Sequence, residues 1–262
     1  MVSDVNGVGT NYASRLFAGQ QEGGLGDDYV QPFEAFPNLA LVKTYNVNAQ
    51  TPDSAGTGTA MMAGVKTNIG IVGVNSNVKR GDCSALPGNT VLSMNEIATE
   101  MGKETGIVST ARITHATPAS AYAKSADRNY EAGVPEGCDT QADIATQLID
   151  AMEAGTIDLA MGGGMRNFHG DEGGRREDGV NLIERAQSLG AHFASDQASF
   201  EAAPLDGTPI LGLFENSHMM YEADRADEPS LAEMTEAAIT ALQAKSGDNG
   251  FFLQVEAGRV DH

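Results

Sequence analysis

Apolar and polar positions alternate along the chain with two periods, one typical of strands and one typical of helices. Short apolar runs predict strands at residues 39–45, 105–111, 156–164, 209–214 and 250–256. Apolar residues three or four positions apart predict helices at residues 55–65, 90–101, 140–155, 181–190 and 230–245. This alternation predicts an α/β fold, in which a largely parallel central sheet is sandwiched between helices.

The alternation runs along the whole chain without an internal repeat or a long linker. Residues 1–262 are therefore expected to form a single α/β domain. Two glycine-rich stretches lack the spacing of nucleotide-binding loops. In GTAMMAGVKT, Val65 separates the second glycine from Lys66, and the triplet Gly162–Gly164 lacks spaced glycines, so it predicts a tight turn.

The composition narrows the possible partners. Thirty-six acidic residues face 16 basic ones, which gives a formal charge of −20. Such a charge argues against binding to a nucleic-acid backbone, which needs a basic surface. No apolar run is long enough for a membrane span, and the opening MVSDVNG has no features of a secretory signal. The acidity indicates either an ordinary solvated surface or adaptation to high salt, which would screen the self-repulsion.

The segment TPDSAGTGT at 51–59 could carry chemistry. Asp53 or Ser54 is a suitable N-cap for the helix that follows, and the small residues behind Ser54 would let a large group approach. A helix N-terminus also favours anions such as phosphate. Taken alone, the segment favours a capping serine on a closely packed helix over a nucleophile, and it lacks the G-x-S-x-G pattern of a nucleophile elbow. The segment alone does not decide.

Further polar clusters follow other predicted strands. TARITHATPASAYAKSADRNY supplies His115, Thr117 and Arg128, and an arginine fork can hold two phosphate oxygens. VEAGRVDH, with a glutamate, an aspartate and a histidine, follows the last strand, and Asp4 lies near the start. These oxygen and imidazole groups are suited to Mg²⁺ and Zn²⁺. Ligands bind at the carboxyl edge of parallel sheets, so one shared site is expected.

These segments resemble the alkaline phosphatase family over nearly the whole chain. The resemblance is carried by KTYNVNAQTPDSAGTGTA, by GIVSTARITHATPASAYAKSADRNY and by FFLQVEAGRVDH, in the family's order and spacing. It implies hydrolysis of small phosphate monoesters, with release of inorganic phosphate, at a site with two Zn²⁺ and one Mg²⁺. It also implies a homodimer in the full-length form and the α/β fold already expected.

The resemblance implies a role for each matching residue. Ser54 corresponds to the nucleophile that becomes a phosphoserine and contacts zinc, and Arg128 to the arginine that holds the phosphoryl oxygens. Asp4 corresponds to the carboxylate between a zinc and the magnesium. The remaining implied metal ligands are His115, Thr117 and Glu256 for magnesium and Asp261 for zinc; the adjacent His262 is not one of them.

The chain departs from the family pattern near Asp4 and at its end. Val5 stands where the family has glycine, and it would be strained if that position needs a positive φ. No strand is expected before Asp4, and the family's later zinc ligands are absent after Asp261. The chain is therefore expected to be a fragment cut at both ends, with little activity alone. Alternatives are a non-catalytic phosphate- or metal-binding fragment, or a related sulfatase or phosphodiesterase.

Cys83 and Cys138 are the two cysteines of the chain. Both lie in polar loops, at positions that resemble a disulfide of the family. A bridge is expected in preference to two free thiols. It would imply an oxidising compartment, periplasmic or extracellular.

Overall fold

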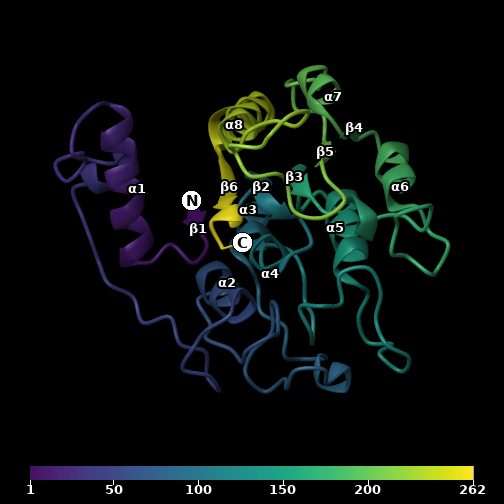
Figure 1. Ribbon diagram of the computed structural model, residues 1–262. Coiled ribbons are helices and arrows are strands. Elements are labelled where there is room, and N and C mark those ends of the chain that lie inside the picture. Colours follow the sequence, from purple (N-terminus) through teal and green to yellow (C-terminus); the bar gives the residue numbers. More distant parts are fainter. Residues whose placement is uncertain (262) are drawn as a thin grey trace.

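A six-stranded, all-parallel sheet forms the centre of the molecule in the computed structural model, which describes residues 1–261 (Figure 1). His262 lies outside the described residues. The strand order is β1-β6-β2-β3-β5-β4. The strands are β1 (Val2–Ser3), β2 (Glu104–Arg112), β3 (Leu159–Gly163), β4 (His192–Ala194), β5 (Ile210–Leu213) and β6 (Phe251–Ala257). The expected α/β architecture is confirmed.

Helices cover both faces of this sheet. They are α1 (Val8–Gln21), α2 (Ser54–Ala63), α3 (Met94–Glu100), α4 (Ala116–Ala119), α5 (Ile144–Glu153), α6 (Leu182–Ser188), α7 (Gln197–Glu201) and α8 (Leu231–Ser246). Helix α8 packs on one face, and α5 and α6 pack on the other. None of the helices in residues 1–261 combines the length and apolar content that a bilayer crossing requires.

Successive residues of β2 explain the two cores. Ile107 points to the core that holds Ile144 and Leu148 of α5, while Val108 points to the core that holds Met234 and Leu242 of α8. This alternation is the period of two expected of a strand whose faces are both covered. The apolar run at 105–111 therefore reflects burial on both sides, as the sequence predicts.

Side-chain caps set the helix starts. Ser230 and Glu233 form the expected capping box of α8, with Ser230 Oγ accepting from the Glu233 amide at 3.1 Å. A second box, Ser93 with Glu96, starts α3 at Met94, so the expected start at residue 90 is wrong. Asp143 caps α5 without a reciprocal box, accepting from the Thr146 amide at 3.0 Å, and residues 140–143 lie outside that helix. The side chain that satisfies the free amides thus fixes the first turn.

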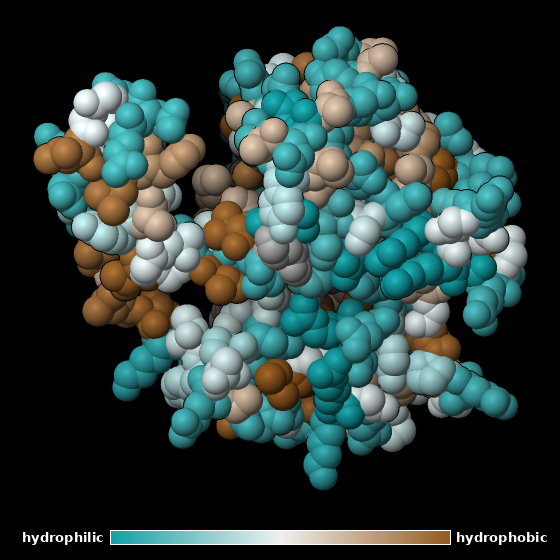
Figure 2. All heavy atoms as spheres, viewed as in Figure 1, coloured by the Kyte–Doolittle hydropathy of each residue, from teal (hydrophilic) through white to brown (hydrophobic). Residues whose placement is uncertain are grey.

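The expected strand at residues 39–45 is wrong. This segment is extended but pairs with no strand among residues 1–261, and Leu39 and Leu41 are 94% and 95% exposed. It connects the body of the protein to α1, which projects at the left of Figure 1 and carries apolar side chains in Figure 2. The apolar pattern of residues 39–45 therefore does not indicate a strand of the sheet. The pattern also missed the helices α1, α4 and α7 and the strands β1 and β4. The presence of β1 corrects the expectation that no strand precedes Asp4.

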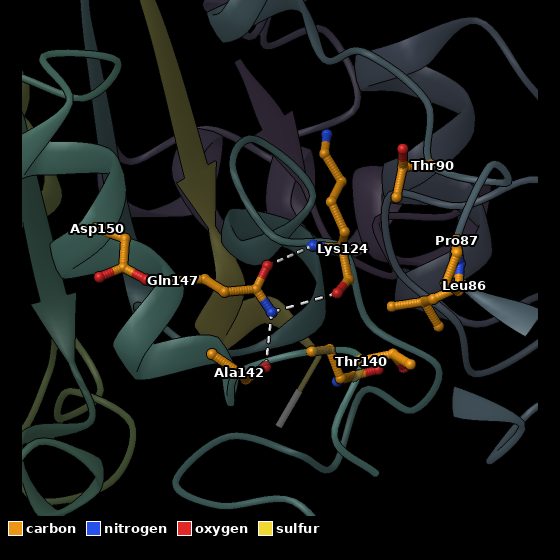
Figure 3. A pocket seen from close by; sticks show the side chains of 9 residues that line it. Leu86, Pro87, Thr90, Lys124, Thr140, Ala142, Gln147 and Asp150 are labelled. Carbon is orange, nitrogen blue, oxygen red and sulfur yellow. Dashed lines mark hydrogen bonds between the residues drawn. The ribbon is translucent and has the colours of Figure 1, made fainter. Parts of the chain in front are cut away.

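The expected disulfide between Cys83 and Cys138 is confirmed, with a Cα–Cα distance of 5.3 Å. It closes a sequence separation of 55 residues and packs with Ile71, Val74 and Leu86 in a small apolar cluster. A shallow depression of about 350 Å³ lies beside it, where Gln147 of α5 bonds the backbone of Lys124 and Ala142 (Figure 3). None of the predicted site residues lines this depression.

Candidate active site

The carboxyl ends of β1, β6 and β2 bring together polar residues from distant parts of the sequence. Asp4 follows β1, and its amide donates to Ala257 O of β6 at 3.3 Å. Glu256 lies near the end of β6, beside Ser109 of β2 in the parallel register. His115 follows β2 and is the N-cap of α4. The structure therefore confirms that the predicted clusters share one sheet edge, as parallel topology requires.

Ser54 is the first residue of α2, and its position is set by Asp53. The Asp53 carboxylate accepts from the Gly56 amide at 3.0 Å, which makes Asp53 the N-cap. Ser54 Oγ therefore does not cap the helix, and it donates to Asp4 Oδ2 at 3.0 Å. Of the two caps that the sequence left open, the structure selects the aspartate and turns the serine toward Asp4.

Packing explains the small residues behind Ser54. A Cβ at Gly56 would lie 2.4 Å from Asn46 Oδ1, and a Cβ at Gly58 would lie 3.0 Å from Ser120 Oγ. Both glycines thus face neighbouring segments of this chain. The interpretation that they make room for a ligand is therefore replaced by close packing, which holds the N-terminus of α2 in place.

Arg128 is held by two site residues. Its Nη1 donates to Asp53 Oδ2 at 3.1 Å, and its Nη2 lies 2.8 Å from His115 Nε2. Burial acts most strongly on Asp53 and opposes its ionisation. The amides of Gly56 and Gly70, together with Arg128, outweigh that effect and lower the Asp53 pKa. Asp53 thus joins the helix start to the guanidinium, a positioning role that the sequence reasoning missed although it named Asp53 as a possible cap.

Glu256 has the most perturbed environment of the site. Its side chain is buried, and this burial is the main cause that raises its pKa to about 7. Repulsion by Asp4 and Asp261 raises the pKa further, whereas hydrogen bonds from Ser109 and Thr117 lower it. Burial also raises the pKa of Asp4, and Asp261 adds to that rise. Glu256 Oε1 is buried without a hydrogen-bond donor within residues 1–261. The mutual repulsion of Asp4, Glu256 and Asp261 therefore favours a bound positive charge beside them, and Arg128 supplies part of that charge at Asp4. Ser109, whose role the sequence did not reveal, bonds the other oxygen of Glu256.

These groups match a hard divalent cation in donor type. Carboxylate and hydroxyl oxygens from Asp4, Glu256 and Thr117 are the ligands that Mg²⁺ prefers, and the orphaned Glu256 oxygen is available to one. Within the described chain, however, no three His, Cys, Asp or Glu side chains form a ready metal-holding group. His115 Nε2 faces Arg128 instead. The oxygen set therefore fits magnesium chemically, while the residues assigned to zinc, Asp4, Ser54 and Asp261, offer only oxygen donors.

Comparison with known proteins gives the family of the chain. The family description "Alkaline phosphatase" matches residues 1–262. The chain belongs to the alkaline phosphatase family. It is 42% identical over 287 residues to a membrane-bound alkaline phosphatase of Bombyx mori, covering 100% of this chain and 51% of that protein. It is 39% identical over 288 residues to the human tissue-nonspecific isozyme, covering 100% of this chain and 54% of that protein.

Solved structures agree with this assignment. The alkaline phosphatase of Thermus thermophilus superposes with a TM-score of 0.78 at 28% identity, covering 100% of this chain and 49% of that chain. The enzyme of the Antarctic bacterium TAB5 superposes with a TM-score of 0.72 at 24% identity, covering 97% and 63%. The chain spans about half the length of the curated alkaline phosphatases that it matches.

Val5 bears out the strain expected at the family's glycine position. Its φ is +52°, in the left-handed region that a β-branched residue rarely adopts. We expect Val5→Gly to stabilise the fold by about 1 kcal/mol, because the strain is relieved and the side chain is 64% exposed. Urea unfolding would measure this change. Val42→Gly, at an exposed extended position with ordinary φ, is the control and should give no gain; an equal gain in both would contradict the strain.

Proposed function

We propose that this alkaline phosphatase homologue hydrolyses phosphate monoesters through a phosphoserine at Ser54. The observation that carries the proposal is the contact set around Ser54. Its Oγ bonds Asp4, while Asp53 links its helix to Arg128. A hydroxyl at a helix N-terminus beside a guanidinium is suited to a phosphoryl group, because both donors complement its oxygens.

The residues of the chain supply attack, orientation and charge. Asp4 accepts the hydrogen of Ser54 Oγ and directs a lone pair outward. Ser54 Oγ then bonds phosphorus as the bond from phosphorus to the ester oxygen breaks. The proton of Ser54 passes to the Asp4 carboxylate, and the leaving oxygen takes up one proton to depart as an alcohol, so that no net proton is gained or lost. Arg128, held by Asp53, stabilises the charge on the equatorial oxygens. Water then attacks the phosphoserine, which restores the Ser54 hydroxyl and releases inorganic phosphate.

As in the family, Mg²⁺ would be held by Asp4, Thr117, His115 and Glu256. The two zinc sites would include Asp4, Ser54 and Asp261. Bound cations would lower the pKa of a hydroxyl and neutralise developing negative charge. The orphaned oxygen of buried Glu256 supports the magnesium assignment. Binding of Mg²⁺ would also remove the repulsion between the carboxylates of Asp4 and Glu256.

Discrimination among ester classes tests the proposal. Arg128 and the α2 N-terminus can engage a dianionic phosphoryl group, whereas a diester or a sulfate ester presents less charge. With Zn²⁺ and Mg²⁺ added, p-nitrophenyl phosphate should be turned over in preference to bis-p-nitrophenyl phosphate and p-nitrophenyl sulfate. Equal or faster turnover of either competitor would instead support the phosphodiesterase or sulfatase alternative.

A second candidate function is phosphate or metal binding without turnover. Phosphate binding at Ser54 and Arg128 does not need a complete set of metal ligands, and no three His, Cys, Asp or Glu side chains within residues 1–261 form one. Metal content per chain distinguishes it, since stoichiometric metal with no ester hydrolysis would select this alternative.

The setting of the protein is part of the proposal. The Cys83–Cys138 bridge supports a periplasmic or extracellular location, because disulfides persist in oxidising compartments. The formal charge of −20 supports adaptation to high salt. The homodimer of the full-length form and the single domain over residues 1–262 remain predictions.

A further inference from the structure

Charge divides the carboxyl edge of the sheet into two parts. The carboxyl groups Asp4, Glu256 and Asp261 gather at the ends of β1 and β6. Arg112 ends β2, and Arg166 follows β3 in the short turn Met165–Asn167. Since β6 lies next to β2 and β2 next to β3, these three carboxyl groups stand on one side of Arg112 and Arg166 along this edge. The proposed phosphoryl site adjoins the carboxyl groups through the bond from Ser54 to Asp4, and its Arg128 contacts His115, which follows β2.

Contacts lead from the phosphoryl site to the basic side. Arg128 lies 2.8 Å from His115, whose ring meets that of His218 edge to face at 5.3 Å between centroids. His218 Nε2 lies 2.7 Å from Arg112 Nη1. His218 reaches this place because the loop after β5 packs closely over Gly163, where a Cβ would lie 2.1 Å from Ser217 O.

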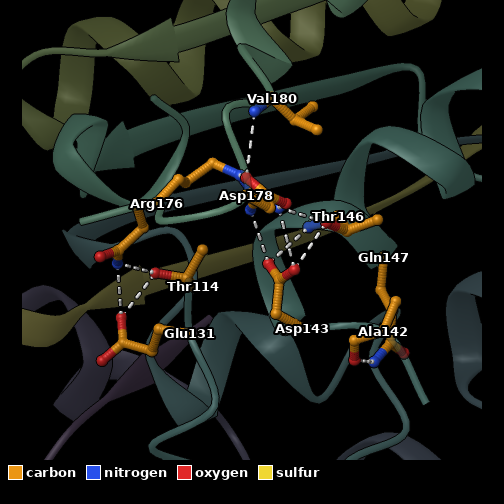
Figure 4. A network of polar contacts seen from close by, with 10 residues as sticks. Thr114, Glu131, Ala142, Asp143, Thr146, Gln147, Arg176, Asp178 and Val180 are labelled. Atoms are coloured by element: carbon orange, nitrogen blue, oxygen red, sulfur yellow. Dashed lines mark hydrogen bonds and ion pairs between the residues drawn. The ribbon is translucent and has the colours of Figure 1, made fainter. Parts of the chain in front are cut away.

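The charge of Arg112 is neutralised within the fold. Glu131 is buried and receives Arg112 Nε and Nη2 at 2.8 and 2.7 Å. The same carboxylate accepts from Thr114 at 2.6 Å (Figure 4). It also accepts from Asn167 at 2.9 Å. With four donors on its two oxygens, Glu131 has little acceptor capacity left for another cation.

Arg166 and Arg175 lack such a partner. Arg166 Nε is buried without a hydrogen-bond acceptor, and neither guanidinium forms an ion pair with any residue from 1 to 261. The two are adjacent, because the Arg175 amide donates to Arg166 O at 2.7 Å. Burial, together with the positive charges of Arg175 and Arg112, lowers the pKa of Arg166 and outweighs the attraction of Glu131, which already receives Arg112. In a chain with a charge of −20, two neighbouring unpaired arginines beside a third are suited to an anionic ligand.

We propose that Arg166, supported by Arg175, binds a second anionic group of the substrate, so that the site prefers phosphate monoesters that also carry a carboxylate or another phosphate. The proposal rests on the phosphoryl site at Ser54 and Arg128 and extends it toward β3. Nearby acidic side chains do not occupy the two arginines, since Asp171, Glu172 and Glu215 form no ion pair with them in the described chain.

Binding of unreactive phosphonates tests this subsite without turnover. Phosphonoacetate, 3-phosphonopropionate and 4-phosphonobutyrate would each be compared with the alkylphosphonate of equal chain length, by titration calorimetry at fixed Mg²⁺ and Zn²⁺. At the best spacing, the carboxylate should tighten binding about tenfold, the effect of one charge-assisted hydrogen bond. Arg166→Gln should remove this gain and leave alkylphosphonate affinity within about twofold.

Two further variants complete the test. Arg175→Gln, at an exposed side chain, should reduce the gain without a risk to folding. Arg185→Gln makes the same charge change on α6, where Arg185 pairs with Asp150 and Glu153, and should keep the gain. Loss of the gain in all three variants, or in none, would overturn the subsite. If the wild type binds the alkylphosphonates but no carboxylate tightens that binding, the subsite alone is overturned. If the wild type binds neither the alkylphosphonates nor the phosphonocarboxylates, the phosphoryl site is overturned as well.

Discussion

Replacing Ser54 by alanine should lower the rate of phosphate-monoester hydrolysis at least about a thousandfold, because the attacking oxygen is removed. The change should leave the fold intact. Within residues 1–261, Ser54 Oγ makes one hydrogen bond, to Asp4, and the N-cap of α2 is Asp53. Steady-state hydrolysis of p-nitrophenyl phosphate, with Zn²⁺ and Mg²⁺ present, would measure the loss.

A matched control separates chemistry from folding. Ser84 is an exposed serine whose hydroxyl also bonds an aspartate, Asp82, at 2.7 Å. Ser84→Ala should retain the wild-type rate. Activity that survives Ser54→Ala would mean that the nucleophile lies elsewhere, and the roles of Asp4 and Arg128 would fail with it.

In the metal-free protein, Glu256 should make the stability fall as the pH rises. Its pKa is about 7 in the folded chain, against 4.5 for an ordinary glutamate. The folded state therefore binds the proton more tightly. The stability that this proton contributes is present below about pH 4.5 and is lost as the pH rises through about 7. The difference corresponds to about 3 kcal/mol.

Glu256→Gln isolates this contribution. Glutamine keeps an oxygen that can accept from Ser109 but cannot ionise, so the variant should lose most of the pH dependence between pH 5 and 8. Urea unfolding in EDTA across that range would compare the two proteins. Added Mg²⁺ at pH 8 should stabilise the wild type more than the variant. Parallel curves for the two proteins would show that burial does not raise the pKa of Glu256 in the folded chain.

The sequence predicted the parts of the fold whose local signals agree with their tertiary contacts. The run at 105–111 lies between α5 and α8, and the Ser230–Glu233 box starts α8 where the pattern placed it. The run at 39–45 has the same apolar character but no neighbouring strand, so its pattern gave no sheet. A two-residue strand such as β1 exists only through its pairing with β6, which no local pattern records.

The site shows the same division. Residue types and the family resemblance indicated Ser54, Arg128 and the acidic ligands, and the fold brings them to one edge. The contacts that position them were not predictable, because they join distant segments. Asp53 reaches Arg128 across 75 residues, and Ser109 reaches Glu256 across 147. Strain at Val5 was predictable, since it depends only on the backbone of one residue.

Capture of phosphate on Ser54 is the most direct test of the account. The protein would be incubated with Zn²⁺, Mg²⁺ and labelled phosphate, quenched in acid and digested, and the peptide that contains Ser54 would be examined by mass spectrometry. Phosphate on Ser54, absent from Ser54→Ala and reduced in Arg128→Ala, is the predicted result. Phosphate on another residue, or turnover of the monoester with no phosphate on Ser54 under any quench, would contradict it.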